Sequence, residues 1–275
     1  MSVWFVTGAS RGLGLEIAKA ALASGESVVA TARDPQEIEK ALPGHAEKLL
    51  ALPLDVTSER QADEAVQAAV ARFGTIDVLV NNAGRGLVGA VEETSDAEAR
   101  AVFDINVFGL MTVLRAVTPI MRAAGSGRIL NISSTGGVVA WAGWGVYSAT
   151  KFALEGITEA LRLELAPLGI QVTSVQPGPL RTDFLASTSL SHVSRVIDDY
   201  AATGGASREW AQASHGQQEG DPVKAAQAIL TIAAADEMPA RLPLGTSTLS
   251  DIRTKLAAVG ADLEKWQELS RSTDV

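Results

Sequence analysis

The chain has 275 residues, 47% hydrophobic and 20% charged, a balance that can fill a large core and does not suit a disordered chain. Its formal charge of −9, from 23 basic and 32 acidic side chains, argues against a cationic face for nucleic acid or an anionic membrane. The absence of cysteine excludes disulfides, thiolate catalysis and cysteine-bound metal. The three histidines lie far apart in the sequence, so we expect no metal site.

We expect a cytoplasmic protein that does not cross a membrane. The first apolar run, Val3–Val6, directly follows Met1 and Ser2, with no basic leader before it. The longest apolar run, at residues 225–235, is too short to span a bilayer.

Apolar runs of strand length alternate with helix-period segments through the first two thirds of the chain, which is typical of a parallel sheet with crossover helices. The expected strands are Val3–Thr7, Ser27–Ala32, Leu49–Leu54, Val78–Asn81, Arg128–Ser133 and Gln171–Gln176. The expected helices are Leu13–Ser24, a short helix capped by Asp34 before Pro35, Ser58–Phe73, Ser95–Ala124 and Tyr147–Leu168. The pattern predicts a single α/β domain over residues 1–275, a doubly wound parallel sheet with helices on both faces.

The pattern changes after Pro177. Glycine and serine clusters interrupt residues 184–220, which we interpret as a mobile lid over the substrate. Asp221 and Pro222 then open a helix to Ala235, and Arg241–Leu244 is a candidate edge strand. Residues 246–275 form a C-terminal extension with two amphipathic helical segments, Ser247–Ala257 and Asp262–Ser270.

The first strand runs into a glycine-rich turn, Thr7-Gly-Ala-Ser-Arg-Gly-Leu-Gly14, that opens a helix. Gly8, Gly12 and Gly14 let the backbone turn sharply and approach a pyrophosphate, whose charge is favoured by the free N–H groups of the helix N-terminus. We therefore expect Ser10, Arg11 and Leu13, together with these glycines, to contact a dinucleotide. A tight turn without a ligand is the alternative.

Further motifs follow in order: Asn81-Asn-Ala-Gly84 after the fourth strand, Asn106 in Asp104-Ile-Asn-Val107, Ser134 thirteen residues before Tyr147, Tyr147-Ser-Ala-Thr-Lys151, and Pro177-Gly-Pro-Leu-Arg-Thr182. In these motifs, over about residues 3–183, the sequence resembles the short-chain dehydrogenases/reductases, which have a Rossmann-type fold.

The resemblance implies roles for several residues. Asp55, Val56, Asn82, Ala83 and Gly84 would meet the adenine side of the cofactor, whereas Pro177, Gly178, Leu180 and Thr182 would lie near the nicotinamide. Lys151 would also hold the nicotinamide ribose. Asn106 would order a water that joins Lys151 to solvent; a local helix kink without chemistry is the alternative.

Tyr147 and Lys151 also predict chemistry from their spacing. If Tyr147 begins a helix, Lys151 lies one turn further on the same face. Its ammonium, ~4 Å from the phenol at an effective dielectric of ~20, would favour the phenolate by ~4 kcal/mol and lower the pKa of Tyr147 from ~10 toward neutrality. We predict that Tyr147 protonates a carbonyl oxygen as hydride arrives from the cofactor. An ordinary surface pair is the alternative.

Ser134 is expected at the carboxyl end of its strand, where it would stabilise the developing negative charge on the same oxygen. The neighbouring Ser133 competes for this role. The spacing that the resemblance implies favours Ser134 and leaves Ser133 a packing or turn residue.

We expect NADP(H) to be preferred, with NAD(H) possible. An acidic residue at the end of the second strand would bind the adenosine ribose and repel a 2′-phosphate, but this chain has Ala32 there, followed by Arg33. Arg33 and Arg11 are positioned in sequence to clamp a 2′-phosphate. A solvent-exposed Arg33 without this role, or use of both cofactors, is the alternative.

The loop between Ser134 and Tyr147 is rich in glycine and carries two indoles. We expect the substrate to contact Ser134, Gly136, Trp141 and Trp144 from this side, and Phe184 and Leu185 from the lid. Interior or subunit packing of the two tryptophans is the alternative. The loop has no arginine or lysine, which favours a neutral, apolar ketone or aldehyde over a carboxylate.

The C-terminal extension replaces the short tail that packs subunits in the family the sequence resembles. We therefore expect a homodimer formed by the helices Ser95–Ala124 and Tyr147–Leu168, with a tetramer as the alternative. The leading functional hypothesis is an NADPH-dependent carbonyl reductase, and the runner-up is an NAD-linked alcohol or steroid dehydrogenase. A non-catalytic dinucleotide-binding regulator is the hypothesis from another class, and the presence of Ser134, Tyr147 and Lys151 argues against it.

Overall fold

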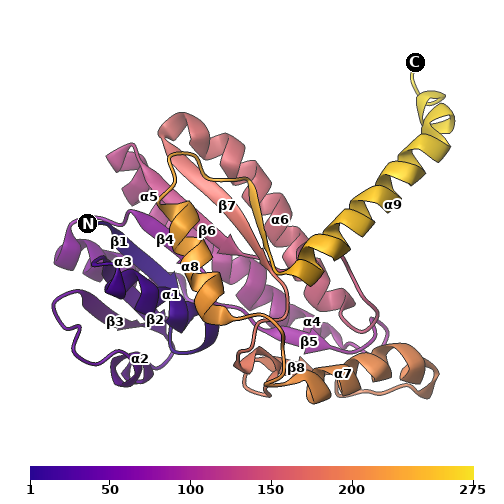
Figure 1. Ribbon diagram of the computed structural model, residues 1–275, viewed down its shortest axis with the longest axis horizontal. Helices are drawn as coiled ribbons and strands as arrows, with labels where there is room; N and C mark the ends of the chain where they lie inside the picture. The colour runs from indigo at the N-terminus through magenta and orange to yellow at the C-terminus, as the bar shows by residue number, and fades with distance from the viewer.

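The computed structural model describes residues 1–275, and its centre is a seven-stranded parallel sheet of order β3-β2-β1-β4-β6-β7-β9 (Figure 1). The strands are β1 (Val3–Thr7), β2 (Ser27–Ala32), β3 (Leu49–Pro53), β4 (Val78–Asn81), β6 (Gly127–Ile132), β7 (Ile170–Pro177) and β9 (Arg241–Leu244). After β1 the chain adds β2 and β3 on one side, and it then adds β4, β6, β7 and β9 on the other side. The order of strands therefore reverses between β1 and β4, as in doubly wound folds. The predicted fold class and strands are confirmed, with shifts of one residue at some ends.

The central strands are buried along their whole length and are mostly apolar, because both faces of the sheet are covered. Every residue of β1, β2 and β4 is buried. Phe5, at the centre of the sheet, pairs with Val29 on one side and Leu79 on the other. Strands of this kind lack the alternation of half-exposed strands, which explains the continuous apolar runs in the sequence.

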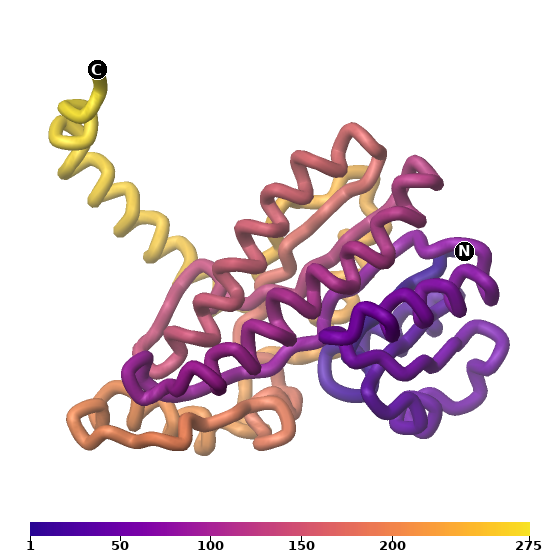
Figure 2. Tube along the Cα trace, turned by 180° about the vertical axis from the view of Figure 1, so that it is seen from behind, coloured from indigo at the N-terminus to yellow at the C-terminus, as the bar shows by residue number.

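Helices cover both faces of the sheet (Figure 2). One face holds α1 (Gly12–Ala23) and α8 (Pro222–Ala233), which contact each other, and α2 (Gln36–Ala41) lies near the β2–β3 edge. The other face holds α3 (Glu59–Phe73), α5 (Leu110–Ala124) and α6 (Gly145–Leu165). Each layer has its own apolar core, the first including Ile17 and Ile229 and the second Met121 and Leu154. The sheet therefore holds its strand ends rigidly for a site at its edge.

Helix boundaries follow the predicted caps, with small corrections. Ser95 and Glu98 form a reciprocal capping box at the start of α4 (Asp96–Phe103). Asp34 was predicted as the N-cap of α2, but the helix begins at Gln36 and its N-cap residue is Pro35. The Asp34 carboxylate still accepts the Gln36 N–H at 3.0 Å. The helix α6 begins at Gly145, two residues before Tyr147, and a 3-10 turn completes it to Leu168. Gly74 ends α3 with a left-handed φ of 82°.

We expected no apolar segment long enough to span a membrane, but the continuous helix formed by α4 and α5 is long enough. Residues Asp96–Ala124 meet the length and composition of a span, with a mean hydropathy of 1.5 in their most apolar window. Half of that window is buried within the protein, where Val113, Val117 and Met121 pack under the sheet. The burial is that of a core helix.

Two short strands were not predicted. The segment β5 (Gly86–Val88) pairs in parallel with β8 (Leu190–His192), outside the main sheet. The strand β8 belongs to residues 184–220, which also contain two 3-10 turns, a π-helical turn at Ala201–Gly205 and the helix α7 (Ala206–Ser214). This pairing joins the segment after β4 to the predicted lid. Three-residue strands are too short to show a period in the sequence.

The C-terminal extension is one continuous helix, α9 (Thr246–Arg271), in place of the two predicted segments. Gly260 does not interrupt it, because one glycine costs a helix only about 1 kcal/mol. Figure 1 shows that α9 leaves the body of the protein and projects outward to the C-terminus.

Candidate active site

The predicted site residues gather around one cavity of about 1100 Å³ at the carboxyl ends of the strands. Those that line it are Gly8, Ser10, Arg11, Gly12, Leu13, Arg33, Asp55, Val56, Asn82, Ala83, Gly84, Ser134, Trp141, Trp144, Tyr147, Lys151, Pro177, Gly178, Leu180, Thr182, Phe184 and Leu185. Gly14, Asn106 and Gly136 do not lie on its wall. Residues spread over most of the chain therefore meet at one place.

The glycine-rich turn fits a phosphate-bearing ligand. Gly8 and Gly12 adopt positive φ angles of 65° and 57°, which only glycine adopts without strain. The helix α1 starts at Gly12, and no side chain caps its first N–H groups, which stay available for an anion. Gly14 has a packing role, because a Cβ atom there would lie 2.4 Å from the Gly8 carbonyl oxygen.

The Asn82–Gly84 motif is held against the glycine-rich turn by hydrogen bonds. The Thr7 hydroxyl accepts the N–H groups of Asn82 at 2.9 Å and Ala83 at 3.0 Å. The Asn82 side chain in turn donates to the carbonyl oxygen of Thr7 at 2.9 Å. These bonds fix the ends of β1 and β4 relative to each other and complete one wall of the dinucleotide site.

Ser134 and Tyr147 lie together, as predicted from their spacing. The interaction of their side chains lowers the pKa of Tyr147, but burial of the phenol acts more strongly and raises this pKa to about 12. Ser134 starts a short 3-10 turn and accepts the Gly136 N–H at 3.0 Å. Gly136 thus holds the Ser134 hydroxyl and does not line the cavity itself, and its contact with the substrate stays a prediction. Ser133 instead packs against Gly137, where a Cβ atom would lie 2.6 Å from its hydroxyl oxygen.

The predicted lowering of the Tyr147 pKa by Lys151 is wrong, because burial of the phenol raises this pKa. The Lys151 ammonium donates to the carbonyl oxygen of Ile132 at 2.9 Å and lies 5.9 Å from the centre of the Tyr147 ring. Burial lowers the pKa of Lys151 to about 8, although the Glu155 carboxylate acts in the opposite direction. Burial of the phenol therefore outweighs its hydrogen bond with Ser134, and the raised pKa of Tyr147 favours the protonated phenol.

Asn106 lies in a π-helical turn, Asp104–Gly109, between α4 and α5. Its side-chain oxygen accepts the Arg85 N–H at 2.9 Å, and its side-chain nitrogen donates to the Arg85 carbonyl oxygen and the Thr150 hydroxyl. Asn106 thus connects the chain after Gly84 to the helix that carries Tyr147 and Lys151. It is a positioning residue, and its link to solvent through a water stays a prediction.

The two arginines predicted to share a 2′-phosphate do not behave alike. Arg33 is exposed beside Ala32 on the cavity wall and has no ion-pair partner. Arg11 instead donates to the Thr188 carbonyl oxygen at 3.2 Å and the Ser189 hydroxyl at 3.0 Å. The structure therefore leaves Arg33 as the candidate for the phosphate and connects Arg11 to residues 184–220.

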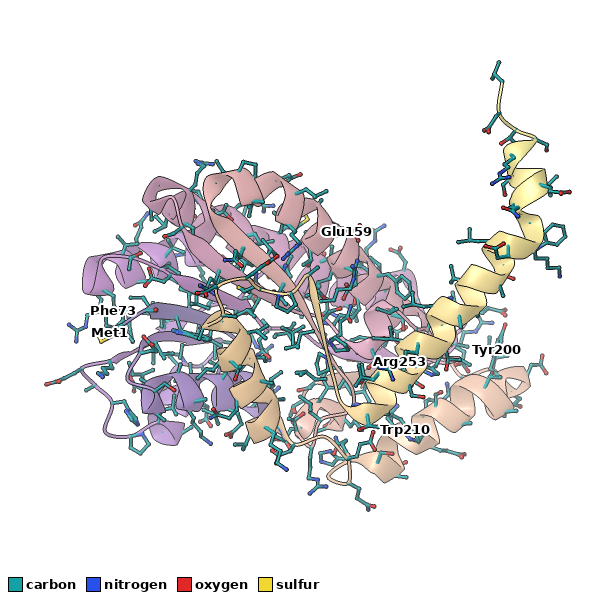
Figure 3. The ribbon with its side chains drawn as sticks, turned by 45° about the horizontal axis from the view of Figure 1, so that its top comes forward. Met1, Phe73, Glu159, Tyr200, Trp210 and Arg253 are labelled. Atoms are coloured by element: carbon teal, nitrogen blue, oxygen red, sulfur yellow. The ribbon has the colours of Figure 1, made fainter.

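Aromatic side chains surround Tyr147 on the wall of the cavity. The Tyr147 ring lies 5.9 Å from that of Trp144 and 5.7 Å from that of Phe184, measured between centroids. Trp210 of α7, which the sequence analysis missed, packs edge-on against Trp144 at 6.2 Å. Trp210, labelled in Figure 3, lines the cavity together with Ser247 and Asp251 of α9.

Arg85 is a second lining residue that the sequence analysis missed. It follows Gly84 directly and lies outside the loop between Ser134 and Tyr147, which has no arginine or lysine. Its guanidinium donates to the Ser191 hydroxyl of β8. The loop between Ser134 and Tyr147 is therefore only part of the cavity lining, and Arg85 adds a basic residue to it from another part of the chain.

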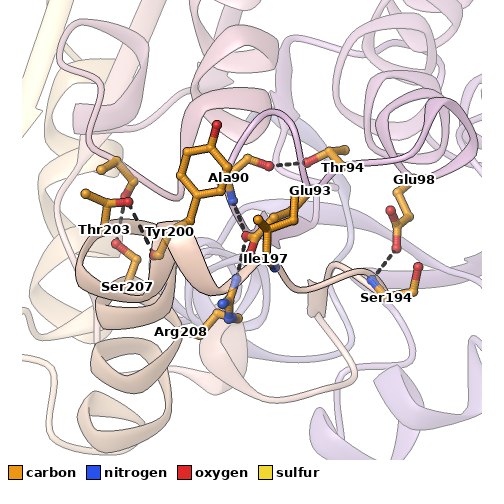
Figure 4. Close-up of polar contacts among 11 residues, drawn as sticks. Ala90, Glu93, Thr94, Glu98, Ser194, Ile197, Tyr200, Thr203, Ser207 and Arg208 are labelled. Atoms are coloured by element: carbon orange, nitrogen blue, oxygen red, sulfur yellow. Dashed lines mark hydrogen bonds and ion pairs between the residues drawn. The ribbon is translucent and has the colours of Figure 1, made fainter.

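Residues 184–220 lie over the cavity, and Glu93 fastens them to the body of the protein (Figure 4). The buried Glu93 carboxylate accepts the N–H groups of Ala90 at 2.8 Å and Ile197 at 2.9 Å, and it pairs with Arg208 at 2.6 Å. The Thr203–Gly205 break is not a free hinge, since a Cβ atom on Gly204 would lie 3.0 Å from the Ala90 nitrogen. Residues of this segment line the cavity, and its role as a mobile lid stays a prediction.

We predict that Glu93→Gln loosens this segment and lowers the free energy of unfolding by about 3 kcal/mol at neutral pH, because one partner of a buried ion pair is lost. Burial raises the pKa of Glu93, but the bonds from Arg208, Ile197 and Ala90 outweigh it and lower this pKa to about 2. The stabilisation is complete above the ordinary pKa of 4.5 and is lost as the pH falls toward about 2. Thermal unfolding at several pH values measures it.

The matched control is Glu92→Gln, which removes the neighbouring carboxylate that accepts the Tyr200 hydroxyl at the surface. We expect little change in stability from it. Equal melting temperatures for wild type and Glu93→Gln at neutral pH would contradict the role of Glu93.

Hydrogen exchange tests whether residues 184–220 move. A lid predicts fast exchange across much of this segment in the free protein and slower exchange with NADPH and a slow substrate or inhibitor. The pairing of β8 with β5 predicts that residues 190–193 are the best protected within it. Uniformly slow exchange in the free protein would show a rigid surface segment instead.

The comparisons with known proteins agree with this geometry. A family model described as short chain dehydrogenase matches residues 2–192. The oxidoreductase BOA17 of Botryotinia fuckeliana is 38% identical over 269 residues, which cover 98% of this chain and 97% of that protein. A short-chain dehydrogenase structure from Streptomyces avermitilis has a TM-score of 0.92 and 41% identity, with each chain covered completely. The chain belongs to the short-chain dehydrogenase/reductase family.

Other relatives carry more specific descriptions. The 3-ketodihydrosphingosine reductase of Bacteroides thetaiotaomicron is 40% identical over 196 residues, 71% of this chain and 70% of that protein. ElxO was solved with NADP bound, with a TM-score of 0.75, 27% identity, and 90% and 99% of the two chains covered. The 3-ketoacyl-(acyl-carrier-protein) reductase of Brucella melitensis was solved with NADH, with a TM-score of 0.73, 25% identity, and 88% and 96% covered. The chain is thus an oxidoreductase of a family whose solved members bind nicotinamide dinucleotides.

Proposed function

We propose that this protein is an NADPH-dependent carbonyl reductase that converts an apolar ketone or aldehyde to its alcohol. The observation that carries the proposal is the placement of Ser134, Tyr147 and Lys151 on one wall of the cavity formed by the glycine-rich turn. A bound nicotinamide would supply the hydride. The protein's own residues bind the carbonyl oxygen and provide the proton.

Tyr147 is suited to the reductive direction. Its raised pKa, about 12, keeps the phenol protonated at neutral pH, so it can donate to an oxygen that becomes negative. The Ser134 hydroxyl is positioned to donate a second hydrogen bond to the same oxygen. Lys151, with a pKa lowered to about 8, is the nearby group that can return a proton to the phenolate.

The preference for NADPH rests on the residues at the end of β2. Ala32 offers no carboxylate to repel a 2′-phosphate, and the exposed Arg33 forms no ion pair, although the Asp55 carboxylate lies near enough for Arg33 to lower its pKa. The fit of the dinucleotide as a whole rests on the left-handed glycines and the uncapped start of α1.

The proposed apolarity of the substrate rests on the wall formed by Trp144, Phe184 and Trp210 around Tyr147. Three aromatic side chains can bury a large apolar group, and burial of apolar area contributes about 25 cal/mol per Å². The relative described as a 3-ketodihydrosphingosine reductase supports a ketone as the reacting group.

A screen of ketones, aldehydes and alcohols with both cofactors tests the proposal. We expect NADPH oxidation that is fastest with apolar ketones. Faster turnover of alcohols with NAD would favour the alternative, an NAD-linked alcohol or steroid dehydrogenase. Tight cofactor binding without turnover on any compound would favour a non-catalytic regulator instead.

A further inference from the structure

The helix α9 is anchored only at its start. The Thr248 side chain is buried, and its hydroxyl lies 2.8 Å from that of Thr135, next to Ser134. Beyond Ile252 nearly every residue of the helix is exposed, and Figures 1 and 2 show the helix projecting from the body. A projecting helix gains nothing from packing within its own chain, so its sequence should show what else stabilises it.

The exposed part carries one continuous apolar stripe. Successive residues of the stripe are alternately three and four positions apart in the sequence: Leu249, Ile252, Leu256, Val259, Leu263 and Trp266. This is the heptad spacing of a coiled-coil seam, narrower than the apolar face of a helix that packs on a globular core. Leu256 is 60% exposed, Leu263 68% and Trp266 52%, so the seam has no partner within the chain.

The charges beside the seam differ between its two halves. Arg253 and Lys255 flank the seam in its first half and Asp262 flanks it in the second, while Asp251, Glu264 and Lys265 lie further round the helix. Two copies of the helix running in the same direction bring like charges together. Two copies running in opposite directions bring the basic half of each against the acidic half of the other.

The seam is also self-complementary in the opposite-direction arrangement. A two-fold axis between Ala257 and Ala258 places Leu249 opposite Trp266, Ile252 opposite Leu263, and Leu256 opposite Val259. The flanking positions then bring Lys255 of each helix beside Asp262 of the other copy. Leucine holds the first seam position throughout, and Ile252, Val259 and Trp266 hold the second, whereas parallel pairs favour Ile or Val at the first position and Leu at the second.

We propose that α9 pairs with α9 of a second copy of this chain as an antiparallel coiled coil. The helix has 26 residues, about 39 Å at ~1.5 Å per residue, so the two bodies lie at opposite ends of the pair. The interface is isologous, as a two-fold axis requires. It is separate from the helix pairing expected of residues 95–124 and 147–168, and it explains why the extension is one unbroken helix.

The first test breaks the seam. Sedimentation equilibrium of Leu256→Glu/Leu263→Glu should give half the particle mass of the wild type, because charges replace two apolar layers. The control, Thr254→Glu/Ala261→Glu, adds the same charges on the opposite face and should keep the wild-type mass. Retained NADPH binding shows that the body is folded. Equal masses for the wild type and the seam variant would overturn the proposal.

The second test determines the direction of pairing. The chain has no cysteine, so Leu249→Cys/Trp266→Cys carries only the two introduced thiols. These are ~25 Å apart along one helix, too far for a short bis-maleimide to link within a chain. We expect linked peptides that join position 249 of one chain to position 266 of the other. Links from 249 to 249, or no links, would overturn the antiparallel pairing.

A charge exchange tests the register. Lys255→Glu and Asp262→Lys should each weaken self-association, because each places two like charges side by side. The double variant should restore self-association, because an acidic residue at 255 again meets a basic residue at 262 of the other copy. A double variant as weak as the singles would overturn the proposed pairing of positions 255 and 262.

Discussion

Tyr147→Phe should lower kcat by at least ~10²-fold, the low end for removal of a general acid, while folding and NADPH binding stay nearly unchanged. The substitution removes one hydroxyl, and the ring keeps its contacts with Trp144 and Phe184. Steady-state kinetics and NADPH titration of the purified variant measure the two effects. A variant that keeps more than a tenth of the wild-type kcat would contradict the assignment.

The chain offers a matched control, because it has only one other tyrosine. Tyr200→Phe removes a hydroxyl that donates to Glu92 at the surface of the segment over the cavity. We expect its kcat to stay close to the wild-type value. A comparable loss in both variants would show a general effect of lost hydroxyls rather than proton transfer by Tyr147.

Arg33→Ala should weaken NADPH binding by ~1.5–3 kcal/mol, the range for a hydrogen bond to a charged group, and should leave NADH binding nearly unchanged. The reason is that the guanidinium meets only the 2′-phosphate that distinguishes the two cofactors. Fluorescence or calorimetric titration with both cofactors measures the difference. Equal losses for NADPH and NADH would show that Arg33 acts through the structure of the loop.

Arg11→Ala is the control for charge. It removes the same positive charge from the cavity wall, but this guanidinium is bonded to Thr188 and Ser189. We expect a smaller change in the ratio of the two affinities than in Arg33→Ala. A larger change would return Arg11 to the phosphate site that the sequence predicted for it.

Local patterns were enough to predict the sheet and the location of the site. Buried strands such as Ser27–Ala32 are mostly apolar and lack polar alternation, and their carboxyl ends meet at one edge of a parallel sheet. Gly8 and Gly12 were identifiable because a sharp turn between a strand and a helix requires them. Each of these features depends on residues that are close in sequence.

The features that were missed or wrongly predicted depend on distant contacts. Glu93 meets Ile197 and Arg208, more than a hundred residues away, and no local pattern indicates such a partner. Trp210 reaches the cavity through the path of the segment after Thr182. The pKa of Tyr147 depends on how completely the fold buries the phenol, which spacing from Lys151 does not show.

Because β8 pairs with β5, residues 184–220 can move away from the cavity only if main-chain hydrogen bonds break. Main-chain bonds join this segment to the body, among them those from Gly86 N–H to the Ser189 carbonyl and from Val193 N–H to the Val88 carbonyl. A flap that turns about glycines keeps its main-chain bonds, whereas this segment has to break some of them. Opening is therefore a local unfolding event, and its free energy falls with denaturant concentration. If opening limits turnover, the enzyme runs faster in dilute urea than in water, until global unfolding begins.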